Sequence, residues 1–158
     1  MTDEMEPGER GWLWAPAVLS ALGILVSGYL SVKRFTGGSL ACSRWAQCDV
    51  VNNSVYAKFH GIPVAFIGLA GYLVLLGLAI ASLQTEGPTQ RRLLGLSFLL
   101  ALGGVGFSAY LTYLELYVIQ ALCNWCMASA TLITLLAVVG VVNLWRAGRG
   151  PVDLPTAS

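Results

Sequence analysis

The residues with the clearest chemistry are four cysteines, which fall into two pairs along the chain. The second pair belongs to the motif Cys123-Asn124-Trp125-Cys126. Residues three apart share a helical face, and that separation is compatible with a disulfide, whose Cα atoms lie roughly 4.4–6.8 Å apart. The free N–H groups and dipole at a helix start favour a thiolate, which is the nucleophile of thiol chemistry. The motif therefore predicts thiol–disulfide exchange; the alternative is a pair of buried, inert cysteines.

The first pair, Cys42 and Cys48, is separated by five residues. This spacing fits a small disulfide ring that only fastens a loop, and it also fits one half of a redox relay. Gly37-Gly38 precedes the pair and gives the loop freedom to hinge. Four cysteines could instead supply a four-thiolate zinc site, but the loop spacing is long for zinc. We therefore favour the relay and expect no metal.

The elements that carry these cysteines have the composition of membrane helices. Only 11% of the 158 residues are charged and 56% are hydrophobic, whereas soluble domains carry about 25% charged residues. Four runs without charge reach the roughly 20 residues that cross a bilayer, where the backbone must satisfy its own hydrogen bonds. We predict one all-α membrane domain over 1–158, a four-transmembrane-helix bundle with helices at about 11–34, 61–84, 92–116 and 122–146.

The first run is expected to stay in the mature protein as a transmembrane helix. A signal peptide begins with basic residues, but Met1 to Arg10 holds four acidic residues and one arginine. Trp12 and Trp14 fit an interfacial anchor at the helix end. Only about a dozen residues follow the last run, so we expect no fused thioredoxin-like domain.

Four spans place both termini on one side of the membrane and all four cysteines on the other. The long loop at about 35–60 and the turn at about 117–122 share the cysteine side, and the linker at 84–92 lies opposite. Lys and Arg near the span ends number five on the terminal side and four on the cysteine side, so the positive-inside rule does not orient the chain. Disulfides persist in oxidising compartments. We therefore expect an extracytoplasmic loop, cytoplasmic termini and a cell (plasma or inner) membrane location.

Five motifs follow one another in order along the chain: Cys48-Asp49-Val50-Val51-Asn52-Asn53-Ser54, Tyr56-Ala57-Lys58-Phe59, Gly61-Ile62-Pro63, Ser108-Ala109-Tyr110-Leu111 and the CxxC motif. Together they resemble the vitamin K epoxide reductase family, and its bacterial branch most closely, over roughly 11–145. The other bacterial four-helix family of quinone-linked disulfide generators has its CxxC-type pair in the first outer loop. Here the spaced pair comes first, which favours the vitamin K epoxide reductase family.

The resemblance implies a thiol:quinone oxidoreductase whose two cysteine pairs act in sequence. Cys42 would exchange with a separate thioredoxin-fold (DsbA-like) protein on the extracytoplasmic side. Cys48 would then form a transient disulfide with Cys123, and Cys126 would deliver electrons to a quinone held in the bundle. The quinone would be ubiquinone, menaquinone or a vitamin K-like molecule, and the net reaction would support disulfide formation in exported proteins.

By position, the resemblance also nominates a quinone pocket around Cys126. Its members would be Ser54, Tyr56, His60, Phe66, Tyr72, Ser108 and Leu111. Four of them also have a structural interpretation. Phe66 and Leu111 fit ordinary helix packing, Ser108 fits a polar contact between membrane helices, and the Tyr72 hydroxyl could bond a neighbouring backbone group.

Two ionisable residues invite a role in proton transfer, because quinone reduction consumes protons. His60 is the only histidine and lies at the predicted membrane edge, where an interfacial polar group is the alternative. Glu115 lies near the end of the third run, and an ionisable group within a span is a functional hypothesis by default. Its alternative is to reach water or to pair with Lys58 or Arg44.

The chain departs from the vertebrate branch at two positions tied to vitamin K binding. Ala130 stands where that branch has tyrosine, and Val64-Ala65 contains no asparagine. Plain quinone reduction is therefore favoured over epoxide reduction, and reduction of vitamin K quinone or its epoxide stays an alternative. The remaining alternatives are a structural membrane protein whose disulfides only brace its outer face, and a small transporter or assembly factor, which the scarcity of charge within the runs disfavours.

Overall fold

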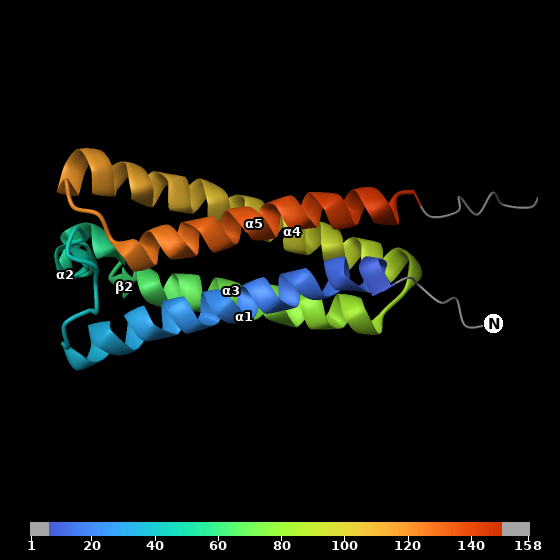
Figure 1. Ribbon diagram of the computed structural model, residues 1–158, viewed down its shortest axis with the longest axis horizontal. Helices are drawn as coiled ribbons and strands as arrows, with labels where there is room; N and C mark the ends of the chain where they lie inside the picture. The colour runs from blue at the N-terminus through green and yellow to red at the C-terminus, as the bar shows by residue number, and fades with distance from the viewer. Residues whose placement is uncertain (1–6, 150–158) are drawn as a thin grey trace, which may run out of the picture.

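The structure, a computed structural model, describes residues 7–149 as an antiparallel bundle of four long helices (Figure 1). These are α1 (Pro7–Thr36), α3 (Val64–Gln84), α4 (Gly87–Tyr113) and α5 (Asn124–Ala147). They pack in the cyclic order α1, α3, α4, α5, so that α5 closes the ring against α1. The predicted four-helix all-α membrane bundle is confirmed. The ends of the predicted domain, 1–6 and 150–158, lie outside the described residues.

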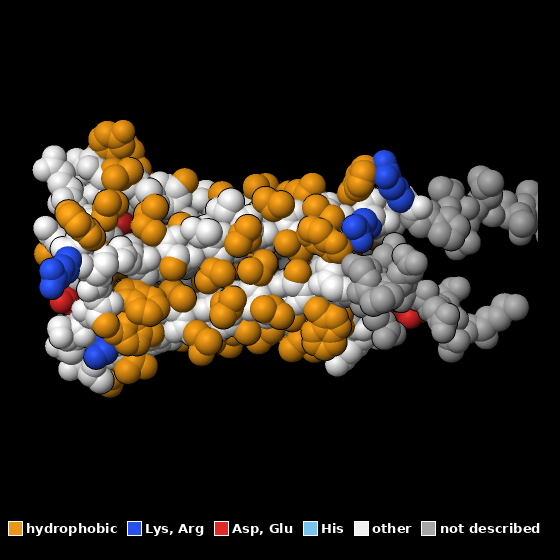
Figure 2. All heavy atoms as spheres, viewed as in Figure 1, with side chains coloured by type: hydrophobic (Ala, Val, Ile, Leu, Met, Phe, Trp, Pro, Cys, Tyr) orange, Lys and Arg blue, Asp and Glu red, His pale blue; other side chains and the backbone are white. Residues whose placement is uncertain are grey.

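The sides of the bundle are apolar, which fits a surrounding of lipid. Large side chains such as Leu25 on α1 and Leu99 on α4 are 69% and 63% exposed. Figure 2 shows such hydrophobic side chains along the length of the bundle, with lysines and arginines gathered at its two ends. All four long helices are long and apolar enough to cross a membrane. Exposed apolar surface of this extent is costly in water, so the chain is a multi-pass membrane protein.

All four long helices begin a few residues away from the predicted positions, and the differences at α4 and α3 have a local cause. Helix α4 starts at Gly87, before the predicted 92, because Pro88 occupies the first turn, where proline has no N–H to leave unpaired. Helix α3 starts at Val64, after the predicted 61, because the preceding residues form a hairpin of β1 (Lys58–Phe59) and β2 (Ile62–Pro63). The predicted linker at 84–92 is therefore reduced to Thr85 and Glu86, which lead directly from α3 into α4.

The segment between α1 and α3 is ordered and covers one end of the bundle (Figure 1). It contains the short helix α2 (Cys48–Asn53), the turn η1 (Val55–Ala57) and the β1–β2 hairpin. The Arg34 side chain, at the end of α1, donates to the Asn52 carbonyl and to Asn53 Oδ1. A basic side chain thus fills the free carbonyl end of α2, where a cation is favoured.

Helix α4 continues into a π-helical segment, η2 (Leu114–Ile119), beyond the predicted end at 116. It stops at Gln120, which adopts a left-handed conformation with φ 55°. The Ala121 amide returns to the Glu115 carbonyl at 3.1 Å. π-Helical turns are rare and often occur at functional sites, and this one lies beside the start of α5.

At the opposite end of the bundle, the first turns of α1 meet the last turns of α5. The Asn143 side-chain amide donates to the Trp12 carbonyl at 3.1 Å, and the Arg146 guanidinium lies 5.2 Å from the centre of the Trp12 ring. The connection between α3 and α4 lies at this same end (Figure 1). The four cysteines are therefore at the end of the bundle remote from these contacts.

A tyrosine near mid-bundle joins three helices. Tyr72 on α3 is 4% exposed, and its ring lies against the backbone of α1 at Gly23, where a Cβ atom would come within 2.3 Å of the ring. Its hydroxyl donates to the Ser129 carbonyl of α5 at 2.8 Å. Glycine is needed at this contact because any side chain would displace the ring.

We expect Gly23→Ala to destabilise the bundle by about 1–3 kcal/mol, the usual cost of forcing extra volume into a packed core. Unfolding of the detergent-solubilised protein, followed by tryptophan fluorescence, measures the change. Gly28→Ala is the matched control, because nothing lies within 4 Å of the Cβ that it would add on the same helix. Equal stability of the two variants would contradict this account of the Tyr72 contact.

Candidate active site

All four cysteines lie at one end of the bundle, where the loop after α1 meets the start of α5. Cys42 and Cys48 are joined in a disulfide with Cα atoms 6.3 Å apart, whereas Cys123 and Cys126 are free thiols. Cys48 begins α2, and Cys123 is the N-cap of α5. These two are 1% and 0% exposed and share one buried apolar cluster with Leu30, Leu40, Val51 and Ala121. The structure thus brings one cysteine of each pair into a common core.

The two residues between Cys123 and Cys126 hold the disulfide loop in place. The Asn124 side chain donates to the Ser43 hydroxyl at 2.7 Å, and the Trp125 indole N–H donates to the Ala41 carbonyl at 2.8 Å. A backbone bond from the Gln47 amide to the Leu122 carbonyl, at 2.9 Å, adds a third link. The middle of the CxxC motif therefore positions the first cysteine pair over the second.

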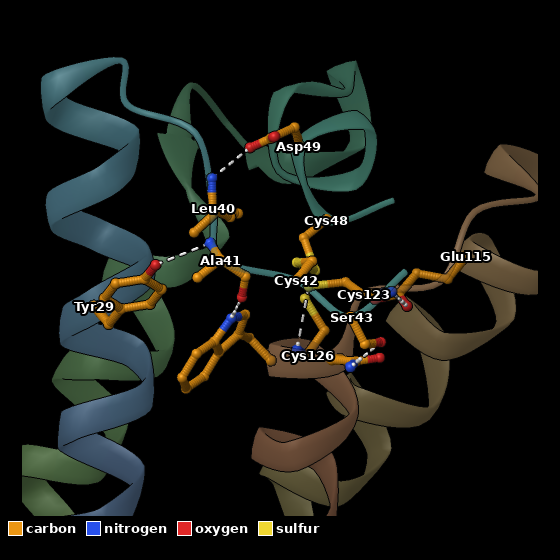
Figure 3. Close-up of a disulfide and its surroundings, with 12 residues drawn as sticks. Tyr29, Leu40, Ala41, Cys42, Ser43, Cys48, Asp49, Glu115, Cys123 and Cys126 are labelled. Carbon is orange, nitrogen blue, oxygen red and sulfur yellow. Dashed lines mark hydrogen bonds between the residues drawn. A yellow bond between two sulfur atoms is a disulfide. The ribbon is translucent and has the colours of Figure 1, made fainter. Parts of the chain in front are cut away.

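The other side of the loop is fastened to α1 and α2. The Leu40 amide donates to Asp49 Oδ1 at 2.9 Å, and the Ala41 amide donates to the Tyr29 hydroxyl at 3.0 Å (Figure 3). The Tyr29 ring also packs on Trp125, with centroids 4.8 Å apart. Although Gly37-Gly38 precedes the loop, the disulfide is held from both sides in this arrangement.

Hydrogen bonds from Cys126 favour a thiolate at Cys123. Hydrogen bonding from the Cys126 thiol lowers the pKa of Cys123 below its usual value, and the backbone amide of Cys126 contributes to the same shift. That amide donates to Cys123 Sγ at 3.3 Å. Burial and the Glu115 charge act in the opposite direction but do not prevail. Cys123 is thus prepared for nucleophilic exchange, as expected at a helix N-terminus.

A pocket opens beside Cys126 between the long helices and α2. The pocket has a volume of about 120 Å³, counted as the space open to the centres of water-sized groups. A single water needs only roughly 10–15 Å³ on the same measure, so the pocket is larger than a single-water cavity. Its walls combine apolar side chains with hydroxyls and one carboxylate. All long helices contribute, among them Ser27 and Leu30, Ala65 and Gly68, Phe107, Ser108 and Leu111, and Cys126 and Ser129.

The described sulfur atoms do not form a metal centre. Cys42 and Cys48 are bonded to one another, so their sulfurs are not available as thiolate ligands. Within residues 7–149, no group of three or more His, Cys, Asp or Glu side chains is placed to hold a metal ion. The site is built from a disulfide, a dithiol and an adjoining pocket.

A family model described as the vitamin K epoxide reductase family matches residues 14–141 of this sequence. The chain belongs to this family. Membership makes it a quinone-linked disulfide oxidoreductase in general terms, in a family generally linked to thioredoxin-fold partners. The matched range contains all four cysteines and every residue predicted for the quinone pocket.

Of the seven residues predicted for the quinone pocket of this vitamin K epoxide reductase family member, four line the pocket beside Cys126. These are Ser54, Tyr56, Ser108 and Leu111. They come from the segment after α2 and from one face of α4. Their arrival at one pocket gives a geometric basis for the prediction, whose binding roles remain predictions.

Three predicted residues do not line this pocket. His60 is exposed in the turn between β1 and β2, has φ 50° and packs its ring against Phe59. Phe66 on α3 is 39% exposed. Tyr72 bonds the backbone and hydroxyl of Ser129, as its structural interpretation predicted, and so reaches the pocket only through that residue.

The sequence prediction missed two pocket serines. Ser129 follows Cys126 by three residues, and this helical spacing places both on one face. Ser27 follows Ser20 by seven residues and precedes Ser31 by four, and all three are buried. A serine stripe at heptad spacing within a charge-free run was the signal for a polar inner face on α1.

Glu115 lies inward, which differs from its predicted alternative. It is 4% exposed, and its Oε2 accepts the Cys123 amide at 3.2 Å. The expectation that it reaches water or pairs with Lys58 or Arg44 is wrong, because the π-helical turn directs the side chain toward the start of α5 rather than outward.

Replacement of Cys126 by alanine removes the largest cause of the lowered Cys123 pKa, so we expect that pKa to rise. At a fixed pH below it, less Cys123 thiolate is then present. Ultraviolet absorbance of the thiolate, recorded against pH, measures the titration midpoint of Cys123. Each protein is compared with a second version that also carries Cys123→Ser, so that the difference reports Cys123 alone. Met127→Ala, one residue further along α5 and partly exposed, should leave the midpoint unchanged. An unchanged or lower midpoint in Cys126→Ala contradicts this explanation.

Proposed function

We propose that this protein oxidises an extracytoplasmic dithiol and passes the electrons through two cysteine pairs to a membrane quinone. The observation that carries the proposal is the burial of Cys48 beside Cys123 in one cluster, with Cys126 opening onto a pocket. In the proposed path the loop pair takes electrons from the partner, and the pair at α5 passes them to the quinone.

The electron path that we propose begins at Cys42. A partner thiolate attacks Cys42 Sγ, releases Cys48 as a thiolate, and leaves as a disulfide after its second thiol resolves the mixed intermediate. Cys48 then attacks Cys123 in an oxidised Cys123–Cys126 pair, and Cys42 resolves the new bond. The outcome is a restored Cys42–Cys48 disulfide and a reduced Cys123–Cys126 pair, which is the pattern of bonds in this structure.

The partner's approach from the loop side fits the exposure of the first pair. Cys42 is partly exposed, whereas Cys48 is 1% exposed. Trp45, between them, is 93% exposed. A thiolate must reach a sulfur to exchange with it, so Cys42 is the one open to a protein. We therefore propose a thioredoxin-fold (DsbA-like) protein as the electron donor.

The pocket has the chemistry to bind a quinone head group. Leu30, Phe107 and Leu111 give it apolar walls, and the hydroxyls of Tyr56 and Ser108 offer donors to quinone oxygens. The Ser54 hydroxyl lines the same pocket, but it donates to the Val51 carbonyl at 2.8 Å. Such a mixture of apolar walls and few polar groups is typical of small-molecule sites. The Cys126 thiol at the edge of the pocket supplies the electrons.

Quinone reduction is thermodynamically reasonable for a donor of this class. Thioredoxin-fold oxidants of the DsbA type have potentials of about −120 mV, and each 30 mV corresponds to about 1.4 kcal/mol for two electrons. A membrane quinone of higher potential accepts these electrons with a loss of free energy. Ubiquinone, menaquinone and vitamin K-like quinones are the candidates.

Plain quinone reduction is favoured over reduction of vitamin K epoxide. Val64, Ala65 and Ala130, the positions at which the chain departs from the vertebrate branch, all line the pocket. Their side chains offer no hydrogen-bond donor or acceptor. Reduction of vitamin K quinone remains compatible with the pocket.

A purely structural role for the cysteines is disfavoured. Disulfides that only brace the outer face would require Cys123 and Cys126 to be bonded, whereas both are free thiols. The lowered pKa of Cys123 favours reactivity rather than inertness.

The proposal predicts different losses for different cysteines in purified protein supplied with a ubiquinone or menaquinone analogue. Cys123→Ala and Cys126→Ala should abolish dithiol-dependent quinol formation, followed optically. Cys48→Ala should retain reduction by a small dithiol but lose reduction by a thioredoxin-fold partner, because only the relay is broken. Ser39→Ala, in the exposed part of the same loop, serves as the control. Normal turnover by both Cys123→Ala and Cys126→Ala would overturn the mechanism.

We further propose that the cysteine end of the bundle is extracytoplasmic and that both ends of the chain are cytoplasmic, in a cell (plasma or inner) membrane. The test uses single cysteines introduced into a chain whose four native cysteines have been replaced by alanine. A membrane-impermeant maleimide added to intact cells should label Ser39→Cys, and should label Thr89→Cys only after permeabilisation. Both positions are exposed at opposite ends of the bundle. The reverse pattern would invert the topology.

A further inference from the structure

Glu115 is the one charged residue among those that line the pocket beside Cys126. Its side chain is 4% exposed, and it belongs to a membrane-spanning helix. A carboxylate in such a place is costly unless it is paired or can change its protonation state. The presence of Glu115 in an otherwise uncharged pocket therefore needs a specific explanation.

The contacts of Glu115 connect it to both reacting thiols. Oε2 accepts a hydrogen bond from the Cys123 amide at 3.2 Å, and the Cys126 thiol lies beside the same carboxylate. Figure 3 shows the side chain reaching from its own helix toward the start of α5. The carboxylate is thus within the pocket, next to the sulfur from which electrons would leave.

The backbone around Glu115 holds it in this position. It lies in the π-helical segment η2, and its own carbonyl accepts the Ala121 amide at 3.1 Å. A wider turn of helix rotates the following residues relative to a regular α-helix. The turn therefore both ends the helix and fixes the carboxylate against Cys123.

We propose that Glu115 is the catalytic base that takes the proton from the Cys126 thiol and passes it to the quinone. The inference deepens the proposed function and rests on it. A neutral acceptor would satisfy the Cys123 amide equally well, so the hydrogen bond alone does not require a carboxylate. Proton transfer at the sulfur beside the pocket does require an ionisable group.

The step conserves atoms and electrons. It starts from a Cys123 thiolate, whose proton has gone to water, and from a Cys126 thiol. The Cys126 proton moves to the Glu115 carboxylate, Cys123 Sγ bonds to Cys126 Sγ, and one electron pair passes to the quinone. Glu115 gives its proton to one quinone oxygen, and water supplies the other proton. A dithiol becomes a disulfide, a quinone becomes a quinol, and Glu115 is again ionised.

Few other titratable groups face Glu115 in the described structure. From the start of α5 these are the thiols of Cys123 and Cys126, and from η1 the Tyr56 phenol lines the same pocket. The Cys42–Cys48 disulfide above them does not titrate. The pH dependence attributed to Glu115 can therefore be separated from that of the thiols by changing only the carboxylate.

The test compares Glu115→Gln, Glu115→Asp and the control Glu86→Gln in purified full-length protein with a soluble ubiquinone analogue and a small dithiol. Glutamine keeps an oxygen for the Cys123 amide but cannot take a proton. We expect it to lower kcat roughly 100-fold or more, as is usual for loss of a general base, with little change in KM for the quinone. The rise of kcat with pH that reports ionisation of the base should disappear.

Glu115→Asp keeps an ionisable group and should recover part of the activity, with that rise in kcat retained but displaced along the pH axis. Glu86→Gln is the same substitution at an exposed position at the opposite end of the bundle. Its kcat and pH profile should match those of the wild type. In quinone-free protein, infrared spectra recorded on acidification should show a carboxylic acid band that Glu115→Gln lacks and Glu86→Gln retains.

Several results would overturn the assignment. One is a wild-type kcat and pH profile for Glu115→Gln, and another is a folded Glu115→Asp as inactive as Glu115→Gln. If Glu115→Gln does not fold, an undisplaced pH profile for Glu115→Asp contradicts the proposal. Failure of the wild-type protein to reduce any quinone would instead refute the proposed function, because that result does not depend on Glu115.

Discussion

The active site depends on the attachment of the first cysteine loop to the beginning of α5. Asn124 and Trp125 lie between the cysteines of the CxxC motif, and their side chains bond the loop at Ser43 and Ala41. Together with the bond from the Gln47 amide to the Leu122 carbonyl, they attach the loop to the start of α5, while Tyr29 and Asp49 hold its other side. The motif therefore supplies the proposed reactive cysteines and also the side chains that hold the other pair beside them.

The membrane imposes the rest of the arrangement. Backbone groups in hydrocarbon must be paired within helices, so irregular structure is confined to the ends of the bundle, where the cysteines lie. Inside, hydroxyls such as those of Ser27, Ser108 and Ser129 reach a pocket from different helices. Polar chemistry is thus concentrated between the helices while their outer faces stay apolar.

The proposed redox path requires different exposure of its different cysteines. Cys42 must be open to a protein, and it is partly exposed, whereas Cys48 and Cys123 are buried. Burial protects the internal exchange from other thiols and peroxides, because reactivity requires access as well as a thiolate. The partly exposed sulfurs, Cys42 and Cys126, thus lie at the two ends of the proposed path, with the buried pair between them.

The sequence by itself determined the four membrane helices, the pairing of cysteines at one face and the family, because hydrophobic run length and ordered motifs are local properties. The tertiary structure alone decided which polar residues meet. It placed Ser54, Tyr56, Ser108 and Leu111 at one pocket but left His60, Phe66 and Tyr72 outside it. It also turned Glu115 inward, through a π-helical turn that leaves no periodic signal in the sequence. Such contacts depend on helix rotation and on short irregular segments, which hydrophobicity does not specify.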